Sequence, residues 1–139
     1  MSALPDCSVR PAQLGDEEVI ARLQVRNWRA LMGDAALASQ GITEEMVAHQ
    51  WEVALGSPRP EGTVLLVALH AHTTVGFAFA GPDEAGAYAG APTCDERESV
   101  RATQVYELVV DPSFRRTGHA SRLLAAVADL TSGQLRVWV

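Results

Sequence analysis

One short basic segment carries the clearest chemistry in the sequence. It lies between an expected strand and an expected helix, and its residues are Arg115, Arg116, Thr117, Gly118, His119, Ala120 and Ser121. Backbone N–H groups at a helix N-terminus lack intrahelical partners, and the helix dipole favours an anion there. Gly118 and the small Ala120 leave the backbone accessible, and the two arginines can contact phosphate oxygens. The segment therefore predicts a diphosphate site. The alternative is an ordinary strand-to-helix turn with two solvated arginines.

Hydrophobic periodicity predicts the elements that position this segment. We expect strands over 7–10, 63–69, 74–80, 104–110 and 135–139, and helices over about 17–33, 43–56 and 118–130. Asp16 is the expected N-cap of the first helix, and 83–99 is expected to be a long loop. The final strand, helix and strand favour a parallel crossover, and the hairpin before them makes the sheet mixed. We therefore expect one α/β (α+β) domain over 1–139, with a mostly antiparallel sheet flanked by helices.

Composition narrows the class of protein. The chain has 139 residues with net charge −6 and a sequence pI of about 5.1, which argues against a general binder of nucleic acid or membrane surfaces. Cys7 and Cys94 match no metal motif and are expected to be free thiols. No signal peptide is evident, and the longest aliphatic run, 64–69, is too short to span a bilayer. We expect a cytoplasmic protein.

The sequence around the basic segment distinguishes between kinds of diphosphate. A nucleotide P-loop needs a lysine, and the chain has none; a Rossmann fingerprint needs three spaced glycines after the first strand. The spacing Arg115-x-x-Gly118-x-Ala120 instead resembles the Gln/Arg-x-x-Gly-x-Gly/Ala signature of GNAT acetyltransferases. Residues 106–112 are similar to that family's fourth strand and its exit, and 120–130 to its third helix. The resemblance implies an acetyl-CoA-dependent N-acetyltransferase that acts on a primary amine of a small molecule or protein. A non-catalytic acyl-CoA-binding module is the alternative.

The resemblance also implies roles along the fourth strand. The backbone groups of Leu108, Val109 and Val110 would pair with the pantetheine arm and hold the acetyl carbonyl. Glu107 is the candidate base, because a carboxylate in a buried strand has a raised pKa; a solvent-facing or arginine-paired Glu is the alternative. Many relatives have a second Glu where this chain has Gln104. Tyr106 should face away from Glu107 unless the strand has a bulge.

The histidines predict no metal site. His70 and His72 fall in an expected turn without a Cys or carboxylate partner nearby, and are expected at the surface. His119 is expected to face solvent or the cofactor. Trp28 and Trp51 either line the acceptor groove or, as aromatic residues more often do, pack in the core. The resemblance implies that the acidic segment 83–99 lies near the acceptor, where its charges would favour a cation; a solvated charge run is the alternative.

The family pattern continues beyond the last expected strand. It adds a helix with an Asn that contacts the cofactor and a Tyr that protonates the thiolate, so the resemblance implies a C-terminally incomplete fold. We expect a truncated chain, completion by another chain, or loss of catalysis. In each case an uncovered strand edge predicts a homo-oligomer.

Overall fold

The computed structural model describes residues 7–60, 62–82, 103–116, 118–131 and 135–137. Its elements are β1 (Cys7–Pro11), α1 (Glu17–Met32), α2 (Asp34–Ser39), α3 (Glu44–Leu55), β2 (Val64–His70), β3 (Thr73–Pro82), β4 (Thr103–Val110), a 3-10 turn η3 (Pro112–Phe114), α4 (His119–Leu130) and β5 (Leu135–Val137). The expected loop over 83–99 lies outside the described residues. Among the helices that are described, none is long and apolar enough to cross a membrane.

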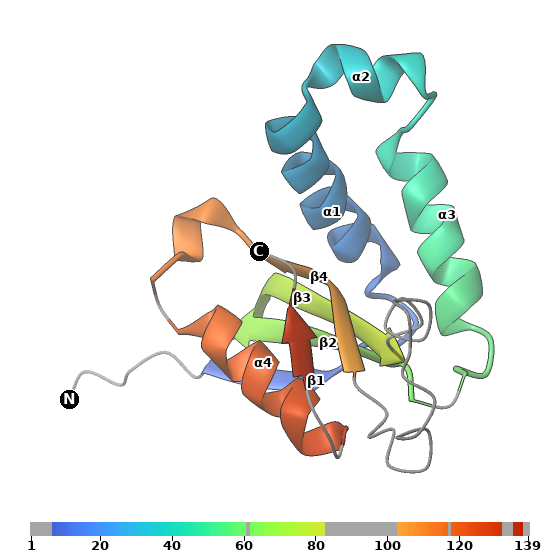
Figure 1. The fold of residues 1–139 in the computed structure, drawn as a ribbon. Coiled ribbons are helices and arrows are strands. Elements are labelled where there is room, and N and C mark those ends of the chain that lie inside the picture. Colours follow the sequence, from blue (N-terminus) through green and yellow to red (C-terminus); the bar gives the residue numbers. More distant parts are fainter. Residues whose placement is uncertain (1–6, 61, 83–102, 117, 132–134, 138–139) are drawn as a thin grey trace, which may run out of the picture.

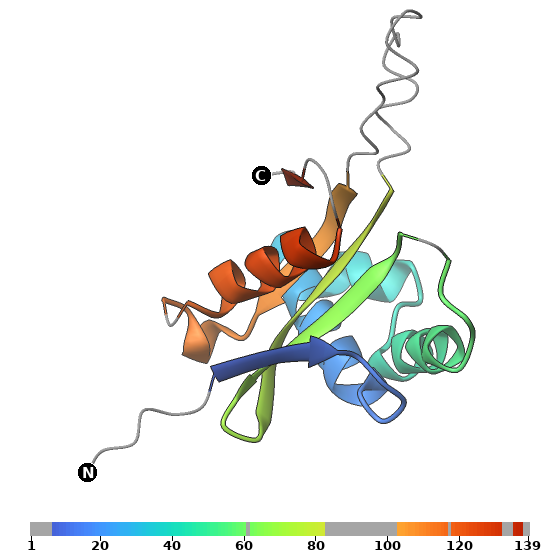
Figure 2. The same ribbon diagram turned by 90° about the horizontal axis from the view of Figure 1, so that it is seen from below.

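The strands form one mixed sheet in the order β1-β2-β3-β4-β5 (Figure 1). The first four strands pair antiparallel, and β5 pairs parallel with the start of β4, over Thr103–Val105. The helices α1 to α3 lie on one face of the sheet and α4 covers the other (Figure 2). The predicted mixed α/β fold, mostly antiparallel and flanked by helices, is confirmed.

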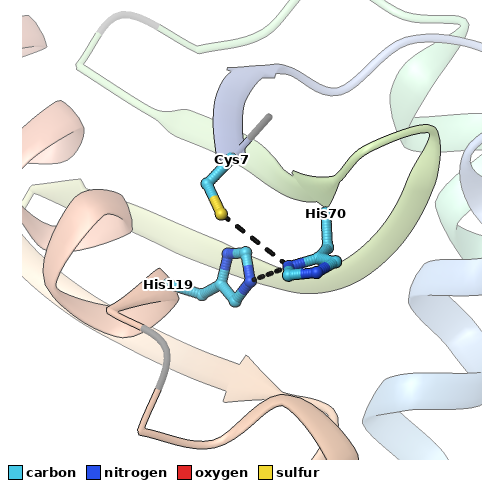
Figure 3. Close-up of side chains that lie close together, drawn as sticks. All are labelled: Cys7, His70 and His119. Atoms are coloured by element: carbon cyan, nitrogen blue, oxygen red, sulfur yellow. Dashed lines mark hydrogen bonds between the residues drawn. The ribbon is translucent and has the colours of Figure 1, made fainter. Parts of the chain in front are cut away.

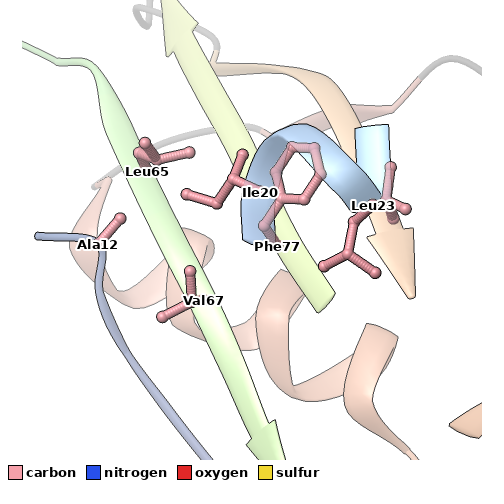
Figure 4. Packing of buried hydrophobic residues seen from close by; sticks show 7 residues of the cluster. Ala12, Ile20, Leu23, Leu65, Val67 and Phe77 are labelled. Atoms are coloured by element: carbon pink, nitrogen blue, oxygen red, sulfur yellow. The ribbon is translucent and has the colours of Figure 1, made fainter. Parts of the chain in front are cut away.

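Alternating side chains of the strands build a separate core on each face. Leu65 and Val67 of β2 pack with Phe77 of β3 and with Ile20 and Leu23 of α1 (Figure 4). The intervening residues of β2, Leu66 and Ala68, pack instead against Leu123 and Val127 of α4. Burying each large apolar side chain stabilises the fold by about 1.5–3 kcal/mol. Helices therefore pack on both faces of the sheet, and α4 is fixed against β2, β3 and β4.

The predicted starts of the first two long helices are confirmed, but only the second start has a side-chain cap. Thr43 caps α3, since its hydroxyl oxygen accepts from the Met46 amide at 3.1 Å. Asp16 occupies the N-cap position of α1, but its side chain makes no capping bond. Leu31 continues the helical spacing of the apolar residues Ile20 and Leu23, yet it is 75% exposed. The short helix α2 was not predicted, because six residues are too few to show a helical period.

Asp16 joins the entry of α1 to β1 instead of capping the helix. Its carboxylate accepts from Arg10 at 2.8 and 3.0 Å and from the Gln13 amide at 2.8 Å. Burial alone would raise the pKa of Asp16, but the Arg10 guanidinium and the Gln13 amide stabilise the carboxylate and leave its pKa below the ordinary value. The charged form is therefore part of the fold.

We predict that Asp16→Ala lowers the free energy of unfolding by about 1.5–3 kcal/mol at pH 7, because Arg10 and the Gln13 amide lose their charged acceptor. Since the folded-state pKa is depressed, this contribution is present above the unfolded-state pKa and disappears as pH falls through the folded-state value. Urea unfolding of both proteins from pH 7 down to acid pH measures the difference. Asp34→Ala is the control, because its carboxylate pairs with Arg29 while 83% exposed and should contribute about 1 kcal/mol or less. An equal effect of the two variants would contradict the prediction.

Candidate active site

A β-bulge in β4 shapes the centre of the candidate site. Glu107 lies opposite Phe79 of β3 and Val105 opposite Ala80, so Tyr106 is an extra residue on its strand. The Tyr106 ring packs on Phe79 with centroids 5.2 Å apart, and its hydroxyl donates to the Pro82 carbonyl at 2.6 Å. A regular strand would place Tyr106 and Glu107 on opposite faces, and the predicted exception to this rule was a bulge. The structure has that bulge.

Glycine at position 81 makes room for this bulge. A Cβ added to Gly81 would lie 2.8 Å from a ring carbon of Tyr106, closer than real Cβ atoms approach another atom. The ring can thus lie over β3 only because the strand is bare at this position.

Glu107 lies half-buried beneath α1 and α3. Its Oε1 accepts from the Gln24 side-chain amide at 2.5 Å, and the Gln24 Oε1 accepts from the Trp51 indole N–H at 2.7 Å. Its Oε2 is buried and has no hydrogen-bond partner among the described residues. Glu107 is therefore paired with an amide, and the alternative of pairing with an arginine is wrong for the described part of the chain.

The surroundings of Glu107 change its acidity. Burial raises the pKa of Glu107, the Gln24 hydrogen bond lowers it, and burial outweighs the bond. A carboxylate with a raised pKa is a better proton acceptor near neutral pH. Gln104 is also buried, but as an amide it cannot take this part, and Glu107 is the only carboxylate in β4.

Beyond its short pairing with β5, the outer edge of β4 has no other strand beside it among the described residues, and we call this stretch the free edge of β4. The Asp111 amide donates to the Val75 carbonyl at 2.7 Å. Bonded pairs alternate along an antiparallel ladder, so Val109 bonds to β3 next. The backbone groups of Leu108 and Val110 then point to the opposite edge. Of the three residues whose backbone groups were predicted to pair with a cofactor, Leu108 and Val110 have theirs on this outer edge. The backbone groups of Val109 face β3 instead.

The basic segment forms the turn between η3 and α4. Arg116 has φ +65° and Gly118 has φ +84°, a left-handed backbone that is uncommon for any residue except glycine. The side chain of Gly118 cannot cap α4, and the first helical bond runs from the Arg122 amide to the Gly118 carbonyl at 3.0 Å. The amides ahead of Arg122 therefore have no helical acceptor, as an anion site requires.

The charges around this turn differ in part from the prediction. Arg115 and Arg116 are exposed, which both the diphosphate site and the alternative of an ordinary turn allow, and Thr117 lies outside the described residues. Arg122, one helical turn further on, was missed: its guanidinium lies 3.3 Å from where a Cβ on Gly118 would be. Its position four residues after the glycine was the available signal, because residues four apart share a helix face.

The prediction that the His119 ring faces solvent or the cofactor is wrong. His119 is 1% exposed, and its Nε2 lies 3.2 Å from His70 Nδ1. The pKa of His119 is lowered by burial and, to a smaller extent, by electrostatic interaction with the neighbouring His70 and Arg122 side chains. Only the backbone of His119 is placed where it could contribute to the predicted anion-binding turn, residues 115–121.

Comparison with known proteins agrees with this arrangement. The Acetyltransferase (GNAT) family matches residues 24–138, which is most of the chain. The chain belongs to the GNAT acetyltransferase family. The resemblance found in the basic turn and the strand before it is thereby confirmed.

Individual GNAT relatives share parts of the sequence or the fold. Mycothiol acetyltransferase of Streptosporangium roseum is 36% identical over 78 residues, which cover 50% of this chain and 23% of that protein. The match thus spans about a quarter of the relative's length. An aminoglycoside N-acetyltransferase in complex with CoA superposes with TM-score 0.67 at 17% identity, covering 100% of this chain and 80% of that one. A GCN5-related N-acetyltransferase from Ralstonia eutropha gives TM-score 0.67 at 16% identity, covering 96% and 84%. Such low identities show a common fold alone.

A groove of about 420 Å³ lies between residues of α1 and α3 in this GNAT domain. It is lined by Glu17, Glu18, Glu44, Glu45 and Glu52, together with Arg22, His49 and Ala48. The two early tryptophans do not line it. Trp28 and Trp51 pack against the core cluster of Val25, Leu37 and Val47, which favours the core-packing alternative for both.

We predict that Gln24→Leu raises the pKa of Glu107, since it removes the one interaction that lowers it. Carboxyl-carbon NMR titration of Glu107 in both proteins measures the shift. Gln40→Leu is the control, because Gln40 is exposed at the end of α2 and should leave the titration unchanged. A lower Glu107 pKa in Gln24→Leu would contradict the assignment of this network.

Proposed function

We propose that this GNAT domain transfers an acetyl group from acetyl-CoA to a primary amine of a small molecule or protein. One observation carries the proposal: one stretch of chain, β4-η3-α4, holds a half-buried carboxylate, a backbone edge left free by the described residues, and a helix N-terminus without a side-chain cap. Each part suits one portion of the reaction, and the three follow one another along the chain.

The turn before α4 would hold the diphosphate of the donor. Backbone amides from Gly118 to Ser121 supply N–H donors, and Arg115, Arg116 and Arg122 supply positive charge in a protein of net charge −6. Thr117 and Ala120 complete the proposed set. An aminoglycoside N-acetyltransferase with the same fold forms a complex with CoA, which supports CoA as the kind of ligand.

The free edge of β4 would hold the pantetheine arm and the thioester. Leu108 and Val110 point backbone groups to this edge, and Val109 between them keeps the strand bonded to β3. As the amine attacks, the thioester oxygen becomes an oxyanion, which a fixed amide stabilises by about 3 kcal/mol. Much of the remaining rate enhancement would come from holding the two reactants in line.

Glu107 would accept the proton of the attacking amine, directly or through a water. The amine nitrogen forms a bond to the carbonyl carbon, the carbon–sulfur bond breaks, and CoA leaves as a thiolate that takes up a proton. Trp51 and Gln24 would hold the carboxylate in place. The acidic groove between α1 and α3 supports a cationic acceptor, in keeping with an aminoglycoside N-acetyltransferase among the proteins of the same fold.

One observation favours a second function, acyl-CoA binding without turnover. Gln104 is buried at the position where many relatives have a second acidic residue, and its Oε1 has no partner among the described residues. Binding of CoA and release of its thiol are therefore measured separately below. A cytoplasmic location and self-association stay predictions, the latter checked by light scattering.

We predict that Gly118→Ala weakens CoA binding about tenfold or more, because a side chain in the left-handed turn strains the backbone and meets the Arg122 guanidinium. Isothermal titration with CoA gives the affinity. Gly41→Ala is the matched control: Gly41 also has a positive φ, of 69°, but nothing lies within 4 Å of its added Cβ. Both variants should lose about 1 kcal/mol of stability, but only Gly118→Ala should lose affinity. Unchanged CoA affinity in Gly118→Ala would overturn the assignment of the turn.

We predict that Glu107→Gln lowers kcat by about 10²–10⁴-fold and leaves CoA affinity unchanged, since the amide keeps the shape but cannot accept a proton. The base acts only when deprotonated, so wild-type activity should rise with pH through the raised pKa of Glu107, and the variant should lose that rise. Thiol release from acetyl-CoA with a panel of amines is the assay. Equal turnover in the variant would remove Glu107 from the mechanism. Wild-type protein that binds CoA but turns over no amine would instead favour the binding module.

A further inference from the structure

Three potential metal ligands converge on the opposite side of the sheet from Glu107. Cys7 comes from β1, His70 from the end of β2 and His119 from the first turn of α4, and their side chains point toward one another (Figure 3). Cys7 and His70 are direct partners in the β1–β2 register. Strand pairing and the docking of α4 thus create a cluster that the sequence does not reveal, because its members lie 63 and 49 residues apart.

The distances within the cluster match those between ligands of one tetrahedral ion. Zinc binds sulfur at about 2.3 Å and imidazole nitrogen at about 2.0–2.1 Å, so tetrahedral ligands lie about 3.6 Å apart for sulfur–nitrogen and about 3.4 Å for nitrogen–nitrogen. Here Cys7 Sγ lies 3.7 Å from His70 Nδ1, and His70 Nδ1 lies 3.2 Å from His119 Nε2. All three ligand atoms lie within 4.8 Å of one another. Two edges of the ligand triangle are in place, and the third needs a contraction of about 1 Å.

Hydrogen bonding alone accounts poorly for the contacts at His70 Nδ1. That atom offers one lone pair or one N–H, yet both Cys7 Sγ and His119 Nε2 approach it. An ion at the centre of the cluster would resolve this conflict, because Cys7 Sγ, His70 Nδ1 and His119 Nε2 would each direct a lone pair at the ion instead of competing for one partner. His119 Nδ1 is buried without a partner among the described residues, and it is not one of the proposed ligand atoms.

We propose that Cys7, His70 and His119 form a binding site for a divalent transition metal of the zinc class. One thiolate and two imidazoles are the ligand types that zinc prefers, and three protein ligands leave a fourth position for water. The ion would tie β1 and β2 to the first residue of α4, directly beneath the anion-binding turn. The sheet lies between this site and Glu107, which contacts α1 on the other face. The site therefore has a role in holding the turn, outside the chemistry of acetyl transfer.

Metal binding is tested on the whole, tag-free chain, so that no added histidines compete. We expect the chelator-stripped protein to take up one equivalent of zinc chloride in equilibrium dialysis. Cobalt(II) in its place should give the visible bands of a tetrahedral ion and a thiolate-to-cobalt charge-transfer band. X-ray absorption of the zinc form should show one sulfur and two imidazole nitrogens. Less than one-tenth of an equivalent bound, or a first shell without sulfur, would overturn the proposal; these readouts need no variant to fold.

Variants then assign the ligands. Cys7→Ser, His70→Gln and His119→Gln should each weaken zinc binding by about tenfold or more, and Cys7→Ser should abolish the charge-transfer band. The matched controls are Cys94→Ser, which removes the other thiol, and His72→Gln, which removes an exposed ring two residues from His70. Both controls should bind as wild type. If a control loses binding while the three variants keep it, the ion lies elsewhere and the assignment is wrong. CoA affinity, measured alongside, separates this result from the proposed acetyl transfer.

Discussion

The bulge at Tyr106 is the constraint on which the rest of the candidate site depends. An antiparallel strand gives each face every second residue, so one inserted residue changes the facing of all that precede it relative to all that follow. Here the insertion separates Val105, whose side chain packs toward α4, from Glu107, whose side chain meets Gln24 of α1. The position of the Glu107 carboxylate thus originates in the bulge.

The bulge in turn depends on the neighbouring strand. The Tyr106 ring needs the space that Gly81 leaves, and the ring is held there by Phe79 and the Pro82 carbonyl. An irregularity in one strand is stabilised by a missing side chain in the next. Burying Glu107 beside this bulge is unfavourable for its charged form, and one amide hydrogen bond compensates only in part. The surroundings of Glu107 therefore raise its proton affinity. This environment disfavours the charged carboxylate and does not stabilise the fold, but it suits a proton acceptor.

Patterns within a few residues of one another predicted the features that depend only on neighbouring residues. The order of strands and the long helices, the Thr43 start and the turn at Gly118 all follow from period, capping and backbone freedom within a few residues. The errors arose where distant segments decide. The Asp16 carboxylate accepts from Arg10 of β1 instead of capping α1, because β1 lies beside it. The Gln24 amide donates to Glu107, which is 83 residues away in the sequence. His119 faces inward because β1 and β2 meet below α4. The spacing of residues along the sequence does not predict contacts between such distant segments.

Helix geometry explains how one residue can belong to two sites. At the first turn of a helix the backbone amides point out along the axis, while the side chains point sideways to whatever the helix covers. His119 therefore presents its amide to the anion-binding turn and its imidazole to Cys7 and His70 beneath it. Anything that fixes the ring also fixes the direction of that amide. The N-terminus of α4 must hold a left-handed backbone at Arg116 and at Gly118 just before it, and such strain persists only when the surroundings over-determine the conformation. The cluster of Cys7, His70 and His119 links the first side chain of α4 to β1 and β2, and so helps to fix this backbone conformation. It does so from the face of the sheet opposite Glu107.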